Sequence, residues 1–285
     1  MRYRKINKKI YSDNMENETV LISKKKNSRK DNVEIDRILN FAVESGRIML
    51  RCGGEIYRVE ETVERICKAF GVEEAEVFAT PTTVMASVYR GDKINSMVKR
   101  LNERSTDLNM MMRVNNLSRN LAYKNMSIEE CEQELKKISE KDAYSTLKTL
   151  VSAGTITASC SILFGGGFID MVVSFIAGFI TKILILFLGS RKLNEFFVNI
   201  IGAGFIAVLS ILLYEIGIVE TMDYITAGVI MLLVPGFALT NAIRDILDGQ
   251  LMAGTAKLSE VLFIGTSIAV GMYVVLNWYL KGGFF

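Results

Sequence analysis

The chain has 285 residues, of which 50% are apolar and 23% charged; its formal net charge is +3, and it contains no histidine. Without histidine, the chain cannot form a Ser-His-Asp or Cys-His catalytic centre or a His-ligated metal site. Its four cysteines include no CxxC pair, so they indicate neither a zinc site nor a disulfide framework.

Charge and hydropathy divide the chain into three regions. Residues 1–32 hold ten Lys/Arg and four Asp/Glu, whereas residues 145–280 hold only six Lys/Arg and eight Asp/Glu. The positive net charge therefore belongs to the N-terminal region, and no basic folded domain indicates a nucleic-acid partner. We expect 1–32 to be a disordered basic tail, 33–142 a cytosolic α+β domain and 143–285 a five-span membrane domain. A weak contact of the tail with anionic lipid is the alternative for that region.

The region 33–142 shows helical and strand patterns in turn. Residues 34–54 have helical periodicity and end on glycines, and residues 56–70 repeat apolar side chains at intervals of three and four. Two short β-branched strands are expected around Pro81. Ser127 begins a capping box, which predicts a last helix of this domain.

Five long apolar stretches follow the α+β region. They cover residues 146–166, 168–188, 196–216, 224–243 and 258–280. Each approaches the ~20 residues that a helix needs to cross a ~30 Å hydrocarbon core. We therefore predict an α-helical integral membrane protein with five transmembrane helices, preceded by a small cytosolic α+β domain. Lys and Arg precede the first stretch and follow the second and fourth, which places the α+β domain on the cytosolic side.

The fourth apolar stretch contains Pro235 and Gly236 near its middle. Proline removes a backbone donor, and in lipid a broken helix persists only where protein or a water-filled cavity satisfies the freed groups. One interpretation is a packed proline kink. The other is a discontinuous helix whose second half directs its positive N-terminal end at an anionic substrate group.

Four polar residues follow this proline at helical spacing, so we expect them to share one face. They are Asn241, Arg244, Asp245 and Asp248. A capping or interfacial role at the cytosolic end of the span is one interpretation. In the other, Arg244 binds a substrate carboxylate through two parallel hydrogen bonds, and Asp245 takes an ammonium group or a proton.

Charged residues inside predicted spans are candidates for proton coupling. Besides Asp248, the second stretch contributes Asp170 and Lys182. Asp170 lies near the outer edge, where an interfacial role is the alternative, and Lys182 can extend toward the cytosolic edge. Because the chain has no histidine, any proton coupling must run through carboxylates, Lys182 or water.

Five polar residues crowd the start of one predicted helix in the α+β region. They are Glu55, Tyr57, Arg58, Glu60 and Thr62. A solvated, capped helix face and a functional cluster both explain them. The sequence contains no phosphate loop and no dinucleotide motif, so we expect no cofactor, no metal ion and no enzyme activity.

Four motifs occur in order along the chain. They are Gly53-Gly-Glu-Ile-Tyr-Arg-Val-Glu-Glu-Thr62, Phe78-Ala-Thr-Pro-Thr82, Val114-Asn-Asn-Leu-Ser-Arg119 and Met231-Leu-Leu-Val-Pro-Gly-Phe-Ala-Leu-Thr-Asn-Ala-Ile-Arg-Asp245, the last followed by Gly249 and Gly254. Together they resemble the threonine/serine exporter family over about residues 35–280. The run from Pro235 to Asp245 is the most specific part of the resemblance.

The resemblance implies a secondary exporter of the bacterial inner (cytoplasmic) membrane with a cytosolic N-terminal domain. Complete members have about ten spans, so a five-span chain implies the larger subunit of a split exporter. A smaller membrane subunit with about four or five spans would then be the partner within the lipid bilayer, and a homo-oligomer stays open. By the same resemblance, the membrane motif implies a transport path along Pro235, Gly236, Thr240, Asn241, Arg244 and Asp245. The cytosolic motif is expected to serve in gating or docking.

Family substrates include threonine and serine, and a split member is associated with succinate export. We therefore expect efflux of small carboxylate metabolites, threonine or serine foremost, coupled to the proton gradient. The alternatives are a dicarboxylate exporter subunit and a membrane-anchored sensor or regulatory subunit.

Overall fold

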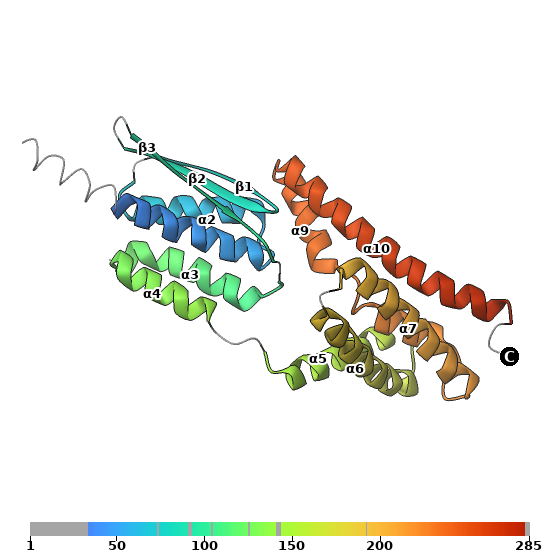
Figure 1. Ribbon diagram of the computed structural model, residues 1–285. Helices are drawn as coiled ribbons and strands as arrows, with labels where there is room; N and C mark the ends of the chain where they lie inside the picture. The colour runs from blue at the N-terminus through green and yellow to red at the C-terminus, as the bar shows by residue number, and fades with distance from the viewer. Residues whose placement is uncertain are drawn as a thin grey trace, which may run out of the picture. The chain divides into compact units, whose positions relative to one another are not determined.

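The structure is a computed structural model that describes residues 34–72, 74–90, 93–103, 105–124, 126–140, 144–191 and 193–282. The predicted basic tail, residues 1–32, lies outside the described residues. The chain divides into two compact units, Met1–Lys141 and Asp142–Phe285. The elements of each unit can be followed in Figure 1.

The N-terminal unit combines helices with a three-stranded antiparallel sheet of order β1-β2-β3. A helix over residues 34–51 is followed by α2 (Ile56–Ala69), β1 (Glu74–Thr80), β2 (Thr83–Arg90), β3 (Lys93–Arg100), α3 (Leu108–Lys124) and α4 (Ile128–Ser139). The two strands predicted around Pro81 are β1 and β2. The sequence did not predict β3, because Asn95 and Lys99 interrupt the apolar alternation on its inner side.

The sheet packs on the helices with one face only. Val84 and Ala86 of β2 are buried, and β1 packs on α2. On the opposite face Phe78, Met85 and Val98 are exposed, and they lie side by side because Phe78 pairs with Met85 and Met85 with Val98. This alternation is the period-two pattern of a strand that is buried on one side.

The helix over residues 34–51 and α2 form a layer between the sheet and the pair α3 and α4 (Figure 1). An ion pair joins the helix to β3, since Lys99 Nζ lies 2.8 Å from Glu44 Oε2. A second pair joins it to α4, where Arg37 Nη2 lies 2.7 Å from Glu132 Oε2. Charged contacts thus connect the outer elements to the central helices at partly exposed positions.

Local sequence signals define the start of α4. The side chain of Ser127 accepts the Glu130 N–H at 3.3 Å, and the Glu130 carboxylate accepts the Ser127 N–H at 2.9 Å. The predicted capping box is therefore confirmed. Farther along this helix Cys131 is buried, and burial raises the pKa of its thiol to about 11. That thiol is protonated and weakly nucleophilic at neutral pH.

The described residues of the second unit form helices joined by short connections, without strands. Its helices are α5 (Thr146–Leu163), α6 (Phe168–Ser190), α7 (Glu195–Glu215), α8 (Asp223–Ile230), α9 (Gly236–Leu247) and α10 (Leu251–Leu280). Within the described residues, three helices are long and apolar enough to cross a membrane: α6, α7 and α10. The protein is thus mostly helical with three candidate spans and a small sheet. Five spans stay a prediction, because α5 does not meet the same criteria and the fourth stretch is divided between α8 and α9.

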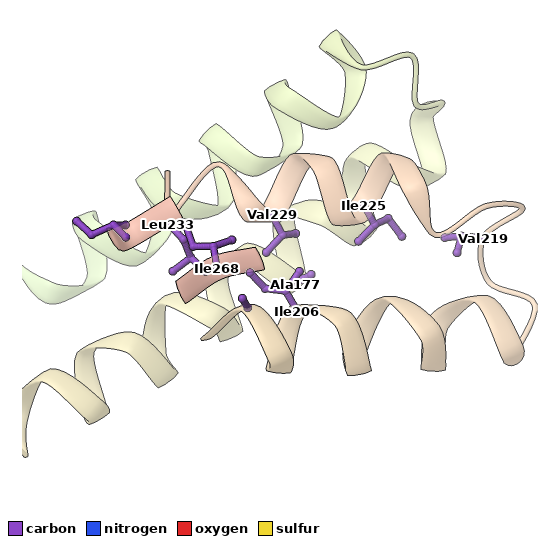
Figure 2. Packing of buried hydrophobic residues seen from close by; sticks show 9 residues of the cluster. Ala177, Ile206, Val219, Ile225, Val229, Leu233 and Ile268 are labelled. Carbon is purple, nitrogen blue, oxygen red and sulfur yellow. The ribbon is translucent and has the colours of Figure 1, made fainter. Parts of the chain in front are cut away.

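The core of this unit surrounds α8. Ile225 and Val229 of α8 and Leu233, which follows it, are buried against Ile206 of α7 and Ile268 of α10, as Figure 2 shows. The short helix α8 is therefore packed among longer helices. This packing fixes the position of its C-terminal end.

Small residues allow α5 and α6 to approach closely. A Cβ atom at Gly178 would lie 2.2 Å from Thr157 Oγ1, a distance that no real contact adopts. The Thr157 hydroxyl donates to the carbonyl of Ser174 at 2.7 Å. Ser174 and Gly178 are small residues four positions apart, so they lie on the same face of α6. This spacing is typical of close helix packing in membranes, and both residues contact α5.

The last helix begins earlier than the sequence predicts. The structure starts α10 at Leu251, seven residues before the predicted stretch 258–280. Lys257, which lies just outside the predicted stretch, is therefore inside α10. Only residues 248–250 separate these two helices, so they form a helical hairpin.

Candidate functional site

The fourth predicted span is interrupted rather than kinked. The helix α8 ends at Ile230, and α9 begins at Gly236 with Pro235 as its N-cap residue. The Pro235 carbonyl accepts the Leu239 N–H at 2.9 Å, and a Cβ atom at Gly236 would meet no described atom within 4 Å. The geometry is that of a discontinuous helix, whose second half starts beside open space.

The start of α9 is exposed, including Thr240, whose hydroxyl donates to the Gly236 carbonyl at 2.9 Å. A threonine hydroxyl bonded in this way is satisfied within its own helix. The N-terminal end of α9 therefore carries the positive end of a helix dipole at an accessible position. An anionic group can approach this end.

The four polar residues predicted to share one face of α9 differ in burial. Asn241 and Asp245 are 5% and 0% exposed, whereas Arg244 and Asp248 are exposed. Their spacing keeps them on one side of the helix, within about 100° of one another, with Asp245 toward the buried edge of that side and Arg244 toward the exposed edge. Asp248 is the C-cap residue where the helix ends.

Asp245 forms an ion pair that sequence reasoning missed. Its Oδ2 atom lies 2.6 Å from Lys257 Nζ, and the two side chains are 0% and 14% exposed. Lys257 lies in α10, three residues after Gly254, where a Cβ atom would lie 2.5 Å from Ile246 Cγ1 of α9. Residues three apart share a helix face. The spacing of Gly254 and Lys257 is the signal that could have placed this lysine against α9.

The helix break and the ion pair are separate places along α9. Asp245 follows Gly236 by nine residues, which corresponds to roughly 13 Å along a helix axis. The predicted transport-path residues therefore fall into two groups. Pro235, Gly236 and Thr240 lie at the break. Asn241, Arg244 and Asp245 lie farther along α9, and of these Asp245 contacts Lys257 of α10.

The charges of α6 are far apart along the helix. Asp170 Oδ2 accepts the Gly167 N–H at 2.8 Å, so it caps the start of α6. Lys182 is half-buried, twelve residues farther on. The capping contact agrees with the interfacial interpretation of Asp170, and proton coupling by Asp170, Lys182 and Asp248 stays a prediction.

The polar cluster of the N-terminal unit is divided between the interior and the surface. Glu55 is buried and pairs with Arg58 at 3.2 Å, and Thr62 is also buried. Glu60 Oε1 accepts the N–H of Ala79 in β1 at 2.9 Å. Glu60 therefore connects the first sequence motif to the second, which is a structural role.

The exposed part of this cluster is the pair Tyr57 and Arg58. Arg58 Nε donates to the Tyr57 hydroxyl at 3.0 Å, and the Arg58 guanidinium carbon lies 5.8 Å from the centre of the tyrosine ring. These two side chains form a preorganised cationic and aromatic surface at the start of α2. Within the cluster Arg58 is exposed, whereas Tyr57 and Glu60 are partly exposed.

The third motif also packs on α2. Arg65 of α2 donates to Ser118 Oγ at 3.2 Å and approaches Asn115 Oδ1 at 3.5 Å. All three motifs of the N-terminal unit therefore meet at α2, so much of their polar character stabilises the fold of this unit.

A polar hollow of about 810 Å³ lies between α3 and α4. Its lining includes Arg113, Asn120, Glu130 and Lys137. None of the predicted site residues lines it. The hollow is open and mixed in charge, and it is separate from the cluster at α2.

Comparison with known proteins places these features in a family. Residues 40–279 match the model of the threonine/serine exporter family, ThrE. The chain is 20% identical to "Probable threonine/serine exporter" of Mycobacterium tuberculosis over 89% of its length, and 24% identical to "Threonine/serine exporter" of Corynebacterium glutamicum over 85%. It covers 48% and 51% of those proteins, so it spans about half their length.

A shorter relative matches from end to end. The chain is 22% identical to "Probable succinate transporter subunit YjjP" of Klebsiella aerogenes, covering 88% of this chain and 98% of that protein. No solved structure matches. Because the family model covers most of the sequence, including the helix break and the motifs of the N-terminal unit, the chain belongs to the threonine/serine exporter family of membrane transport proteins.

Proposed function

We propose that this protein is one subunit of a secondary exporter that moves small carboxylate metabolites, threonine or serine foremost, out of the cell at the expense of the proton gradient. The observation that carries the proposal is the break between α8 and α9. It presents the positive end of α9 beside open space at Gly236. Discontinuous helices of this kind hold substrate carboxylates in other transporters.

The chain's charges fit a carboxylate substrate. Arg244 is exposed on α9, two turns after Gly236, and its planar guanidinium can bind a carboxylate through two parallel hydrogen bonds. Proton coupling would use the carboxylates of Asp170 and Asp248 or the amine of Lys182, because the chain has no histidine. In this proposal the chain resides in a bacterial inner membrane with its N-terminal unit in the cytoplasm.

A second membrane protein would complete the exporter. The chain spans about half of the two threonine/serine exporters but nearly all of the succinate transporter subunit. This supports a two-part exporter in which a smaller partner contributes the remaining spans. The exposed apolar side chains of α10, such as Leu262 and Phe263, are available for lipid or for this partner.

Export is tested by loading cells with a threonine-containing dipeptide and following external threonine. Cells that express the chain with its partner should release threonine faster than cells with either alone. Arg244→Ala should lower this efflux, whereas Arg191→Ala, an exposed arginine at the end of α6, is the matched control. Unchanged efflux with both subunits inserted would contradict export of threonine.

Succinate export is the second candidate function. The end-to-end match to the succinate transporter subunit favours it. Measuring succinate release in the same cells separates the two substrates. A membrane-anchored sensor is the remaining alternative: loss of function in Arg58→Ala with normal function in Arg244→Ala would support it.

A further inference from the structure

The outer face of the β1-β2-β3 sheet, which does not pack on the helices, carries exposed apolar side chains. Phe78, Ile94 and Val98 are each more than half exposed, and Met85 lies between Phe78 and Val98 in the register of the strands. An antiparallel sheet with one face in water normally places polar residues on that face. Exposed apolar surface with a polar border is typical of a protein interaction site.

Among the strand residues that the structure describes, the charges on this face lie at two opposite corners. Glu74 of β1 pairs with Tyr89 of β2 at one end of the sheet, and Thr83 of β2 pairs with Arg100 of β3 at the other end. Glu76 follows Glu74 on the same side of β1. The acidic corner and Arg100 are therefore diagonal to each other across the three strands, and all three charged side chains are exposed.

This diagonal arrangement makes the face complementary to itself. A two-fold axis that lies in the plane of the contact, perpendicular to the line joining the two corners, exchanges one corner with the other. Arg100 of each copy then lies opposite Glu74 and Glu76 of its partner, while the apolar side chains meet near the axis. Sheets pack face to face with both aligned and crossed strands, and two-fold pairs are the commonest protein oligomers.

The composition of the face favours a protein partner over a lipid surface. Interface centres are enriched in aromatic residues, methionine and arginine, and they are depleted in lysine. The outer face includes Phe78, Met85, Tyr89 and Arg100, whereas the two lysines of β3 fall on its other side by the alternation of the strand. The acidic corner would be repelled by an anionic membrane surface.

We propose that the outer face of the sheet is a self-association surface through which two copies of this chain pair about a two-fold axis. The apolar centre supplies the contact area, and the two Arg100–acidic corner contacts determine the orientation of the copies. The inference goes beyond the proposed export function and does not depend on which substrate is moved.

The pairing is measured by cross-linking the full chain in intact cell membranes. Ser87→Cys places a thiol near the middle of the outer face, and a short bismaleimide can bridge two such thiols because sheets packed face to face lie about 10 Å apart. The native cysteines are buried or partly buried, so the chain without Ser87→Cys gives the background. We expect a cross-linked dimer of the chain with Ser87→Cys.

Exchanging the charges tests the orientation. In the Ser87→Cys background, Arg100→Glu brings like charges together in a pair of identical copies, and Glu74→Arg/Glu76→Arg does the same with the opposite sign. Each variant alone should lose about tenfold or more of the dimer, because like charges that face each other oppose association. Coexpression of the two variants with different tags should restore a dimer that carries both tags.

Arg119→Glu is the matched control, since it reverses an exposed arginine of α3 outside the sheet. It should leave the amount of dimer unchanged. The mixed-tag dimer also guards against a fold defect, because two misfolded variants would not restore each other.

The remaining outcomes contradict the inference. Background cross-linking by the Ser87→Cys chain, or equal dimer yields from Arg100→Glu and Arg119→Glu, would show that the face does not pair. Loss of dimer in both charge variants without recovery on coexpression would rule out the two-fold arrangement. Cross-linking within one chain or to a different protein, in place of the dimer, would assign the face to another occupant.

Discussion

The two units of this protein use charge in opposite ways. In the N-terminal unit Glu44 receives hydrogen bonds from Arg47 and Lys99, and all three side chains are partly exposed. In the membrane unit Asp245 faces Lys257 with no exposed surface of its own. Exposed ion pairs typically contribute 0–1 kcal/mol, whereas loss of one partner of a buried pair typically costs about 3–5 kcal/mol. The difference shows that similar contacts contribute little where water screens them and much where water is excluded.

The two cores differ as well. The N-terminal unit buries large side chains such as Phe41, Leu39 and Met49. The membrane unit achieves close helix contacts through glycine: a Cβ atom at Gly271 of α10 would lie 2.3 Å from the Ile200 carbonyl of α7. Small residues are the usual solution where lipid removes the hydrophobic drive between helices.

The largest expected effect concerns the buried pair. Lys257→Met leaves the Asp245 carboxylate buried without its cation, and we expect a loss of about 3–5 kcal/mol in the free energy of unfolding. Adding Asp245→Asn should restore most of this loss. Thermal unfolding of the four proteins of this double-mutant cycle in detergent measures the coupling. Equal stability of all four would show that the pair is not desolvated.

A glycine comparison within α6 comes next. Gly178→Ala places a Cβ atom against Thr157, so α5 and α6 must separate, at a cost of about 1–3 kcal/mol. Gly189→Ala lies in the same helix, where a Cβ atom would meet no described atom within 4 Å. Its higher helix propensity should make it neutral or stabilising. Thermal unfolding of both variants tests the prediction, and a larger loss at Gly189 would contradict the packing.

In the N-terminal unit Glu60→Ala should cost about 1–2 kcal/mol, because the Ala79 N–H of β1 loses its carboxylate acceptor. Hydrogen–deuterium exchange read peptide by peptide should show faster exchange in β1 and α2 and no change in α6 or α7. Glu64→Ala is the control, since its carboxylate pairs with the exposed Lys68 of the same helix. Faster exchange throughout the membrane unit would mean that Glu60 does more than anchor β1.

The smallest effect depends on pH. Burial raises the pKa of Glu44, but hydrogen bonds from Arg47 and Lys99 outweigh it and lower the pKa from 4.5 to about 2. Because the folded-state pKa is depressed, the stabilisation is present above about pH 4.5 and is lost as the pH falls toward 2.

Glu44→Gln should therefore speed hydrogen–deuterium exchange in the helix over residues 34–51 at pH 7 and change it little near pH 2. Glu34→Gln, an exposed carboxylate on the same helix, should change exchange at neither pH. A difference at Glu44 that persists undiminished at pH 2 would rule out the carboxylate as its source.

The sequence predicted the elements whose signals are local. The capping box at Ser127, the helix from Ile56 and the strands around Pro81 depend on neighbouring residues, and the structure contains them. At Pro235 the sequence allowed two interpretations, a packed kink and a discontinuous helix, and the structure has the second. The third strand was not predicted, because it depends on pairing with β2 rather than on its own pattern.

The candidate site could be predicted only in part. Asp245 was identified from its spacing, but its partner Lys257 is twelve residues away on another helix. That contact depends on where α10 begins and on the close approach at Gly254. The opposite burial of Arg244 and Asp245 likewise follows from how α9 is rotated against α10, which helical spacing alone does not specify.

The length of α10 has a consequence for the membrane itself. Its 30 residues extend about 45 Å, whereas a typical hydrocarbon core is ~30 Å thick, and helix tilts rarely exceed ~40°. Trp278 and Tyr279 mark one end as an interfacial anchor, so the opposite end, with Lys257, should reach headgroup depth. Bilayer thickness would then control how much water surrounds the ion pair. Lipids with longer acyl chains should leave less water around the pair, so the coupling between Asp245 and Lys257 in the double-mutant cycle should rise with bilayer thickness.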